Sequence, residues 1–304
     1  MDRLARGLLA ALLLGSPAAA LPCSVCGCGD PQLEASDPAA TSGRLRLQLE
    51  SEYLAITAGS EGAPGSIDHL EQYSLRTDVV YAPLPDLSLL AQLPVVHKDL
   101  ATTGPADRPS SHLTGLGDAE VGARWVLLTR IDLGRQQRQD LAVDGGVSLP
   151  TGGNSARDAS GARIDEHGQL GTGSFGPYLG LHYAFSRGDW YAFGSVSARV
   201  HTTNGYGYQY GQALLWSAHA QRMLSARLAV SLGVDGREAW VDLDHGRAVD
   251  STGGLVLAAT PAAYLDVGQG FWLGARAQIP FFTSLIGQQT VGPVVTAGVQ
   301  YQFL

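Results

Sequence analysis

The chain has 304 residues, of which 39 are Gly and 16% are charged, and its formal net charge is −8. It contains one Lys, Lys98, and no basic run, which excludes a nucleic-acid-binding protein of the usual basic kind. Beyond the first residues no apolar run reaches the roughly eighteen residues that a membrane-spanning helix needs. Since long amphipathic helical patterns are absent too, the composition leaves a β-sandwich, a propeller or a β-barrel.

Residues 1–20 have the three parts of a secretory signal peptide. Arg3 and Arg6 precede a short apolar run, and Ala18 to Ala20 supply the small residues of a cleavage site. We therefore predict Sec-type export and cleavage after Ala20. Lipid attachment at Cys23 is the alternative, but Pro22 directly before it is unfavourable for such processing.

Residues 21–42 follow as a Cys-rich segment, predicted to be periplasmic or to plug a barrel. It holds all three Cys of the chain, Cys23, Cys26 and Cys28. In an oxidising compartment the simplest expectation is one disulfide and one remaining thiol, which could also link to a periplasmic or redox partner. Three thiolates this close could instead bind Cu(I) or Zn, with no other cofactor expected. A c-type haem would need His where Gly27 stands.

From residue 43 to residue 304 the chain repeatedly alternates apolar and polar residues. Successive side chains of a β-strand point to opposite faces, so each such segment is a strand with one apolar and one polar face. We predict twelve strands, with ten or fourteen as alternatives: 44–57, 72–81, 87–95, 118–127, 141–149, 175–185, 190–201, 214–220, 227–235, 255–265, 271–279 and 295–304.

The connections between these segments alternate in length. Those after every second strand are short, whereas the others are longer and polar, including the predicted loops 98–114, 150–172 and 242–254. Short periplasmic turns, long outer loops and an even strand count are typical of outer-membrane barrels. The pattern therefore predicts an all-β, transmembrane, antiparallel up-and-down β-barrel in the cell outer membrane of a Gram-negative bacterium, with the lipid bilayer as a partner.

Three glycine-rich motifs stand in order along the chain: Gly115-Leu116-Gly117-Asp118, Leu149-Pro150-Thr151-Gly152 and Gly171-Thr172-Gly173-Ser174. Their order resembles a bacterial outer-membrane β-barrel family of transporters named for the meta-pathway of phenol degradation. The resemblance spans about Leu45 to the C-terminus and implies transport of aromatic or other small compounds. The chain departs from the family in ending on Leu304, one place after the aromatic Phe303, and in its Cys cluster. By themselves the glycines predict a shaped barrel rim, with Asp118 at its outer mouth facing the lumen.

The polar faces of the predicted strands carry ionisable side chains that would line the lumen. They form either a solvated, salt-bridged lining or a surface that selects solutes by charge. The candidates are Arg44, Arg46, Arg76, Asp78, Glu120, Arg124, Asp144, Arg199 and Arg276.

The predicted function is an outer-membrane, porin-like channel or transporter for small solutes, which could be aromatic or hydrophobic. The alternative is the barrel component of a metal-handling or redox complex, with the Cys cluster as its active part. An outer-membrane hydrolase would need a nucleophile, and no nucleophile motif marks any Ser, so we expect no enzyme. The inward residues that such a hydrolase could use are His182, His201, His219, Ser195, Ser197, Ser217 and Ser231.

Overall fold

A computed structural model describes residues 45–60, 65–105 and 110–303. The predicted signal peptide (1–20), the Cys-rich segment (21–42) and Arg44 lie outside the described residues, so the domain boundaries there stay predictions. Within the described ranges no helix has the length and apolar character needed to cross a membrane.

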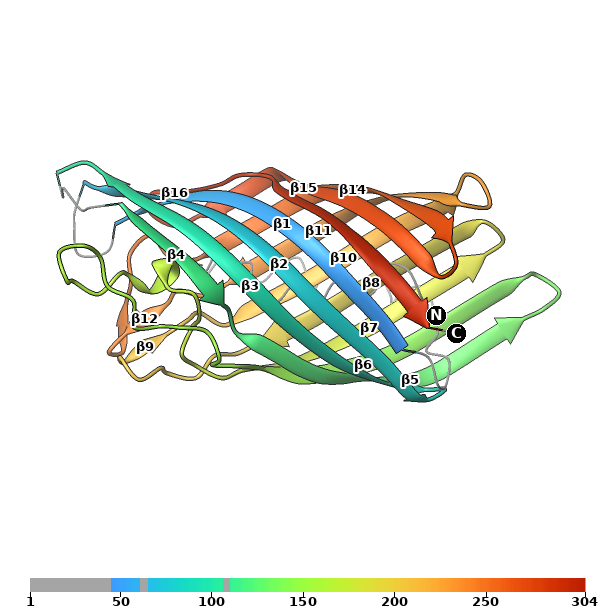
Figure 1. Cartoon of the computed structure of the whole chain (residues 1–304). Helices are drawn as coiled ribbons and strands as arrows, with labels where there is room; N and C mark the ends of the chain where they lie inside the picture. The colour runs from blue at the N-terminus through green and yellow to red at the C-terminus, as the bar shows by residue number, and fades with distance from the viewer. Residues whose placement is uncertain (1–44, 61–64, 106–109, 304) are drawn as a thin grey trace, which may run out of the picture.

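Twelve long antiparallel strands form a closed barrel, which confirms the predicted fold (Figure 1). Each strand pairs with the next barrel strand, and β17 returns to pair with β1. The barrel strands are β1 Leu45–Gly59, β2 Ile67–Leu84, β3 Leu87–Thr103, β5 Ala119–Asp132, β6 Gln137–Leu149, β7 Gly176–Arg187, β8 Trp190–Arg199, β10 Ala213–Met223, β11 Leu228–Ala239, β14 Gly254–Gly268, β15 Phe271–Leu285 and β17 Val294–Phe303.

The last strand closes the barrel in the predicted way. Phe303 pairs with Leu45 and Val295 with Tyr53, so β17 runs antiparallel along β1. In this register Gln300 lies opposite Gln48, inside the barrel. Closure leaves no unpaired sheet edge between β17 and β1. A strand in lipid must have its backbone paired on both sides, because lipid offers no hydrogen-bond partners.

One end of the barrel carries the described chain ends and the short turns (Figure 1). Two-residue turns join β2 to β3, β7 to β8 and β14 to β15. In the last of these Gln269 (φ 56°) and Gly270 (φ 84°) both have positive φ, the type I′ pattern that matches strand twist. The connections at the other end are longer, including 150–175 and 240–253. We assign the short-turn end to the periplasm and the long-loop end to the outside.

The outer end carries additional short elements. These are β4 Ser111–Leu116, which pairs with β3, β16 Gln289–Val291, which pairs with β1, the 3-10 helix η1 Glu166–Gly168, and a small sheet of β9 Tyr208–Gln209, β12 Leu243–Asp244 and β13 Arg247–Ala248. The predicted loop 98–114 is therefore wrong. Strand β3 continues to Thr103 and pairs with β4 from Val95–Leu116 to Leu100–Ser111. Beyond Val95 the outward residues His97, Asp99 and Thr103 are polar, because this hairpin leaves the lipid while its backbone pairing continues.

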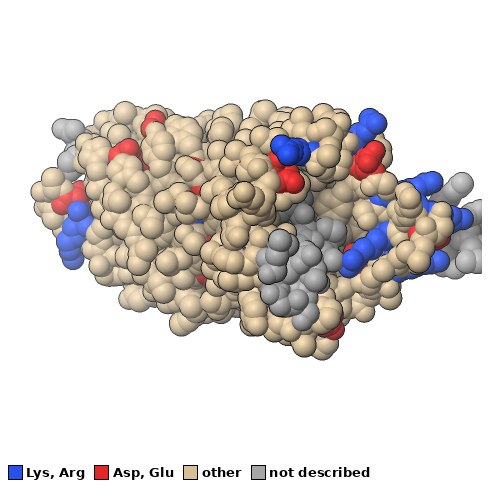
Figure 2. Space-filling model, turned by 45° about the vertical axis from the view of Figure 1, so that its right-hand side comes forward, with Lys and Arg blue, Asp and Glu red and all other residues tan. Residues whose placement is uncertain are grey.

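The outer surface of the barrel is apolar and the inner surface is polar. Large apolar side chains point outward around the wall, among them Leu49, Leu75, Leu93, Leu127, Leu181, Leu232 and Ile279, each at least 41% exposed. Figure 2 shows one side of the molecule as a surface largely free of charge, with Lys, Arg, Asp and Glu gathered towards its ends. So wide an exposed apolar belt is stable only against lipid.

Candidate functional site

One inner wall holds a compact group of ion pairs at β1, β2 and β15. Arg76 Nη2 lies 2.6 Å from Glu50 Oε2, and Arg276 Nη2 lies 3.3 Å from the same oxygen. Arg76 Nη1 also lies 3.6 Å from Glu52 Oε2. Arg276 reaches Glu50 across β17 at Gly298, where an added Cβ would lie 2.8 Å from Glu50 Cγ. Gly298 thus leaves room beside Glu50 on the β17 side, from which Arg276 approaches.

The wall formed by β5 to β8 carries a second group. Arg199 Nη2 lies 2.7 Å from Glu120 Oε2, and its guanidinium stacks over the Tyr178 ring at 5.0 Å. Asp144 Oδ1 lies 2.6 Å from His182 Nε2, which Arg124 Nη2 approaches to 3.3 Å. Positive and negative groups therefore alternate across neighbouring strands rather than gathering by sign.

A third group lies on β10, β11, β14 and β15. His219 Nε2 is 2.7 Å from Asp235 Oδ1, and the hydroxyl of Thr260 donates to the same carboxylate. The His219 ring stacks on Phe193 with centroids 4.7 Å apart. On the neighbouring wall the hydroxyl of Ser195 lies 2.7 Å from that of Ser217. These contacts give the hydrolase alternative no positive support.

The predicted lumen residues can now be placed. Arg44 lies outside the described residues. The others stand on the inward faces of their strands: Arg46, Arg76, Asp78, Glu120, Arg124, Asp144, Arg199 and Arg276. Most of them belong to the first two ion-pair groups, the one on β1, β2 and β15 and the one on β5 to β8. The sequence analysis did not single out Glu52 as a lining residue, although Glu52 shares the strand parity of Glu50 on β1. Whether the lining selects solutes stays a prediction.

The outer mouth is covered by a cap, which we define as loops 150–175, 200–212 and 240–253. Lys98, on the inner face of β3, is only 3% exposed. Its ammonium donates to the carbonyls of His167 (2.9 Å) and Gln169 (2.6 Å). Tyr210 Oη donates to the Glu166 carbonyl at 3.0 Å. Both contacts hold η1 inside the mouth, so the predicted loop 150–172 is folded inward.

A fully buried carboxylate joins the three cap loops. Asp242 is 0% exposed and accepts hydrogen bonds from Tyr208 Oη (2.7 Å) and the Gly211 N–H (2.6 Å). His167 Nε2 lies 3.1 Å from the same carboxylate. A buried carboxylate needs such partners, because an unpaired charge there would cost several kcal/mol. No regular pattern in the sequence marks this contact.

Asp118 brings the three glycine-rich motifs together at the rim. Its Oδ1 accepts from the Gly152 N–H (2.8 Å), and its Oδ2 accepts from the N–H (2.7 Å) and hydroxyl (2.6 Å) of Thr172. A Cβ on Gly152 would lie 2.7 Å from Gly171 Cα, so the loops approach as closely as only Gly allows. Asp118 is thus at the outer mouth with its carboxylate bonded to the loops, and the motifs have a structural role there.

Residues 45–284 match the family described as "Putative MetA-pathway of phenol degradation". The chain belongs to this family. The match to the phenol-degradation family includes all three glycine-rich motifs and the whole cap, and it ends before β16 and β17. No curated protein matches the chain in sequence.

Solved structures share the fold of this family member. An outer-membrane channel from Pseudomonas putida F1 superposes with a TM-score of 0.66 and 13% identity, over 90% of this chain and 100% of its own. The translocator domain of the autotransporter NalP from Neisseria meningitidis gives a TM-score of 0.50 and 13% identity, over 88% and 90%. The CymD monoaromatic hydrocarbon channel superposes with a TM-score of 0.42 and 8% identity, over 86% of this chain and 88% of its own. The first two superpositions show that the chain shares their β-barrel fold, and identities this low show a shared fold alone.

The predicted metal site is formed by residues that the structure does not describe. Cys23, Cys26 and Cys28 are outside the described residues, so binding of Cu(I) or Zn there stays a prediction. Among residues 45–60, 65–105 and 110–303 no group of three or more His, Cys, Asp or Glu is arranged to hold a metal ion. Nothing in the described part of this phenol-degradation family member supports the alternative of a metal-handling or redox complex.

Proposed function

We propose that the protein is an outer-membrane channel that admits small solutes through a narrow, capped interior. The observation that carries the proposal is the paired, ionised lining of a closed barrel whose outer surface is apolar. Lipid cannot supply partners to such groups, and a packed core would not contain them in this number. A polar interior along the barrel axis is suited to water and polar solutes.

The interior is narrow, which limits the size of the solute. The side chains of Arg76 and Arg199 are 4% and 5% exposed, although both stand on the inner wall of the barrel. Twelve strands also lie between barrels that side chains fill and the sixteen-stranded porins with an open aqueous channel. We therefore expect passage of small molecules and exclusion of oligosaccharides.

The cap determines when the channel is open. Lys98 and Asp242 hold η1 inside the mouth, so a solute enters only when this segment moves. The family description names phenol degradation, and the Pseudomonas putida relative is a channel. The family description supports small aromatic or hydrophobic compounds among the solutes, and the Pseudomonas putida structure supports a channel. In this proposal the protein passes its solute unchanged, and esterase and lipase assays in detergent are expected to give no turnover.

The test is conductance in planar bilayers together with swelling of vesicles that contain the purified mature protein. We expect small conductance steps, and swelling with glycine or arabinose but not with raffinose. An Asp242→Ala variant should increase both signals, because it releases the cap. Vesicles that swell no faster than protein-free vesicles, with either protein, would contradict the proposal.

The same conductance measurement tests the role of the N-terminal segment. We propose that residues 21–42 obstruct the periplasmic opening, on the basis of their place before β1 and of Pro22, Pro31 and Pro38. Deletion of Cys23 to Ser42 should then raise the conductance of the full barrel. An unchanged conductance would remove the plug from the proposal and leave the channel itself in place.

A further inference from the structure

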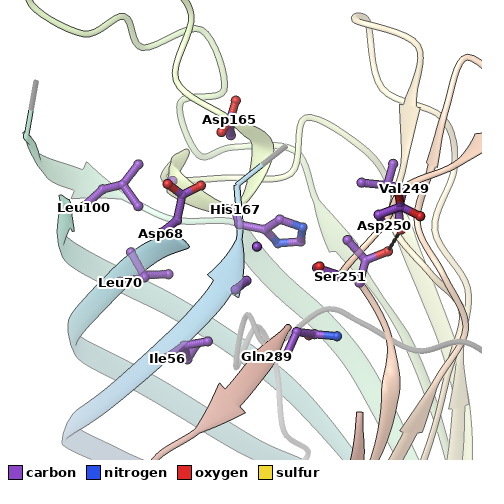
Figure 3. A pocket seen from close by; sticks show the side chains of 14 residues that line it. Ile56, Asp68, Leu70, Leu100, Asp165, His167, Val249, Asp250, Ser251 and Gln289 are labelled. Atoms are coloured by element: carbon purple, nitrogen blue, oxygen red, sulfur yellow. Dashed lines mark hydrogen bonds between the residues drawn. The ribbon is translucent and has the colours of Figure 1, made fainter. Parts of the chain in front are cut away.

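A cavity of about 60 Å³ lies under the cap, between the barrel wall and the loops. Figure 3 shows His167 of the cap at its centre, with Asp68 and Leu70 of β2 on one side and Val249 to Ser251 on the other. No part of it belongs to the three ion-pair groups described above. It lies at the outer end of the barrel, where a solute from outside would enter.

The wall side of the cavity is apolar, which is unusual for the inside of this barrel. Ile56 and Leu70 are 7% and 6% exposed and pack with Leu54, Leu100 and Val294. Of these, Ile56, Leu70 and Leu100 line the cavity. An apolar surface in a polar lumen is costly unless it contacts another apolar surface. This wall therefore favours a solute with an apolar part.

The polar side chains around the cavity favour a positive charge. Asp68, Asp165 and Asp250 are among its fourteen lining residues, and none of the fourteen is Lys or Arg. The Asp68 carboxylate accepts a hydrogen bond from the Thr102 hydroxyl at 2.6 Å, which fixes its position. The nearby ammonium of Lys98 donates to cap carbonyls. Beside Asp68 an ammonium group is therefore favoured over an anion.

The size of the cavity favours a short chain over a ring. A cavity known to bind benzene has about 150 Å³, more than twice the space available here. A chain of three or four carbons fits, provided that it carries its polar group at one end. An aromatic ring would enter only after the cap had moved.

We propose that this cavity binds small aliphatic ammonium ions as the first step of entry, an inference that rests on the proposed channel function. The alkyl chain contacts Ile56 and Leu70, and the ammonium group faces the carboxylates. Deeper along the inner face of β1 the residues change from Ala58, Ile56 and Leu54 to Glu52 and Glu50. A cation that leaves the cavity therefore meets the ion-pair group in which Glu50 and Glu52 are bonded to Arg76 and Arg276.

Calorimetric titration of the full mature protein in detergent tests the charge preference. We expect butylammonium to bind at least tenfold more tightly than butyrate or butanol. Asp68→Asn and Asp250→Asn should each weaken butylammonium binding about tenfold. The matched control Asp158→Asn removes a carboxylate from the same set of outer loops, outside the cavity, and should change nothing. Equal binding of butyrate, or an equal loss in Asp158→Asn, would overturn the proposal.

Two further arms test the cavity itself. Ala58→Leu places side-chain atoms in the cavity and should abolish butylammonium binding while heat-modifiable migration in gels shows a folded barrel. Benzylammonium should bind more weakly than butylammonium, and tighter binding would overturn the size argument. Failure of this inference is distinguishable from failure of the channel: conductance without butylammonium binding overturns the site alone, whereas binding without conductance or swelling overturns the channel function on which the inference rests.

Discussion

Thr172 donates two hydrogen bonds to Asp118, from its backbone N–H at 2.7 Å and from its hydroxyl at 2.6 Å. The two residues are 54 positions apart in the chain, and their contact ties the inward-folded loop to the start of β5. The Gly152 N–H completes the contact at 2.8 Å from the other oxygen. The rim and one side of the cap therefore depend on a single carboxylate.

Replacing this carboxylate should loosen the rim. In Asp118→Ala three donors lose a charged acceptor, and each such hydrogen bond contributes about 1.5–3 kcal/mol. We expect faster cleavage of loop 150–175 by added protease and a barrel that still forms. Ser155→Ala, which removes an exposed hydroxyl from the same loop, is the control. Identical cleavage rates in both variants would contradict the role of Asp118.

Lys98 offers a direct measure of cap opening, because it is the only Lys in the chain. Its ammonium is buried and bonded to two cap carbonyls, so an amine-reactive reagent should modify it much more slowly than the N-terminal amine. Asp242→Asn weakens the junction of the cap loops and should accelerate the modification, as followed by mass spectrometry. The control Asp244→Asn alters an exposed carboxylate bonded to His245 and should leave the rate unchanged.

Gly298 should not tolerate a side chain. A Cβ there would lie 2.7 Å from the Leu49 carbonyl oxygen, a backbone atom that cannot move without shifting β1. Gly298→Ala should lower the free energy of unfolding by about 1–3 kcal/mol, as overpacked sites do. Urea unfolding in lipid vesicles measures this. Gly153→Ala, where a Cβ meets nothing within 4 Å, is the control and should unfold as the natural protein does.

Leu181 tests the assignment of the lipid face. It lies near the middle of β7 and is 46% exposed on the outer surface. Leu181→Arg should cost about 2–4 kcal/mol, the penalty for a cation near the bilayer midplane. Leu181→Phe keeps the position apolar and should unfold at the same urea concentration as the natural protein. If the two variants are equally stable, this face does not contact lipid.

The outer hairpin of β3 and β4 should respond to acid. Asp99 lies beyond the apolar belt, and a hydrogen bond from His112 (2.5 Å) holds the pKa of Asp99 below its ordinary value of 3.8. Because the pKa of Asp99 is lower in the folded protein, the pair stabilises the hairpin fully at pH values above the ordinary pKa. This stabilisation is lost as the pH falls through the lowered pKa of the folded protein. NMR titration should show the pKa of Asp99 rising in His112→Gln but not in His69→Gln, whose ring contacts Thr103 instead.

The sequence alone determined the strands, their faces and the class of fold. The alternation at Val295 to Phe303 identifies a strand with one apolar face, and the short turns mark the periplasmic end, because both signals depend only on neighbouring residues. The inward parity of Arg76 and Arg199 follows in the same way. The polar part of β3 beyond Val95 was missed, since paired backbone outside lipid does not require apolar side chains.

Only the tertiary structure decided what these inward residues contact and how the mouth is closed. Asp118 meets Thr172, Lys98 meets Gln169, and Asp242 meets Tyr208, each across 34 or more positions of the chain. Such contacts depend on barrel closure, which brings separate loops to one rim, and the loops have no periodicity that would reveal their partners. Two arginines on one carboxylate, a buried lysine and a cavity with one apolar wall under the cap are consequences of that closure.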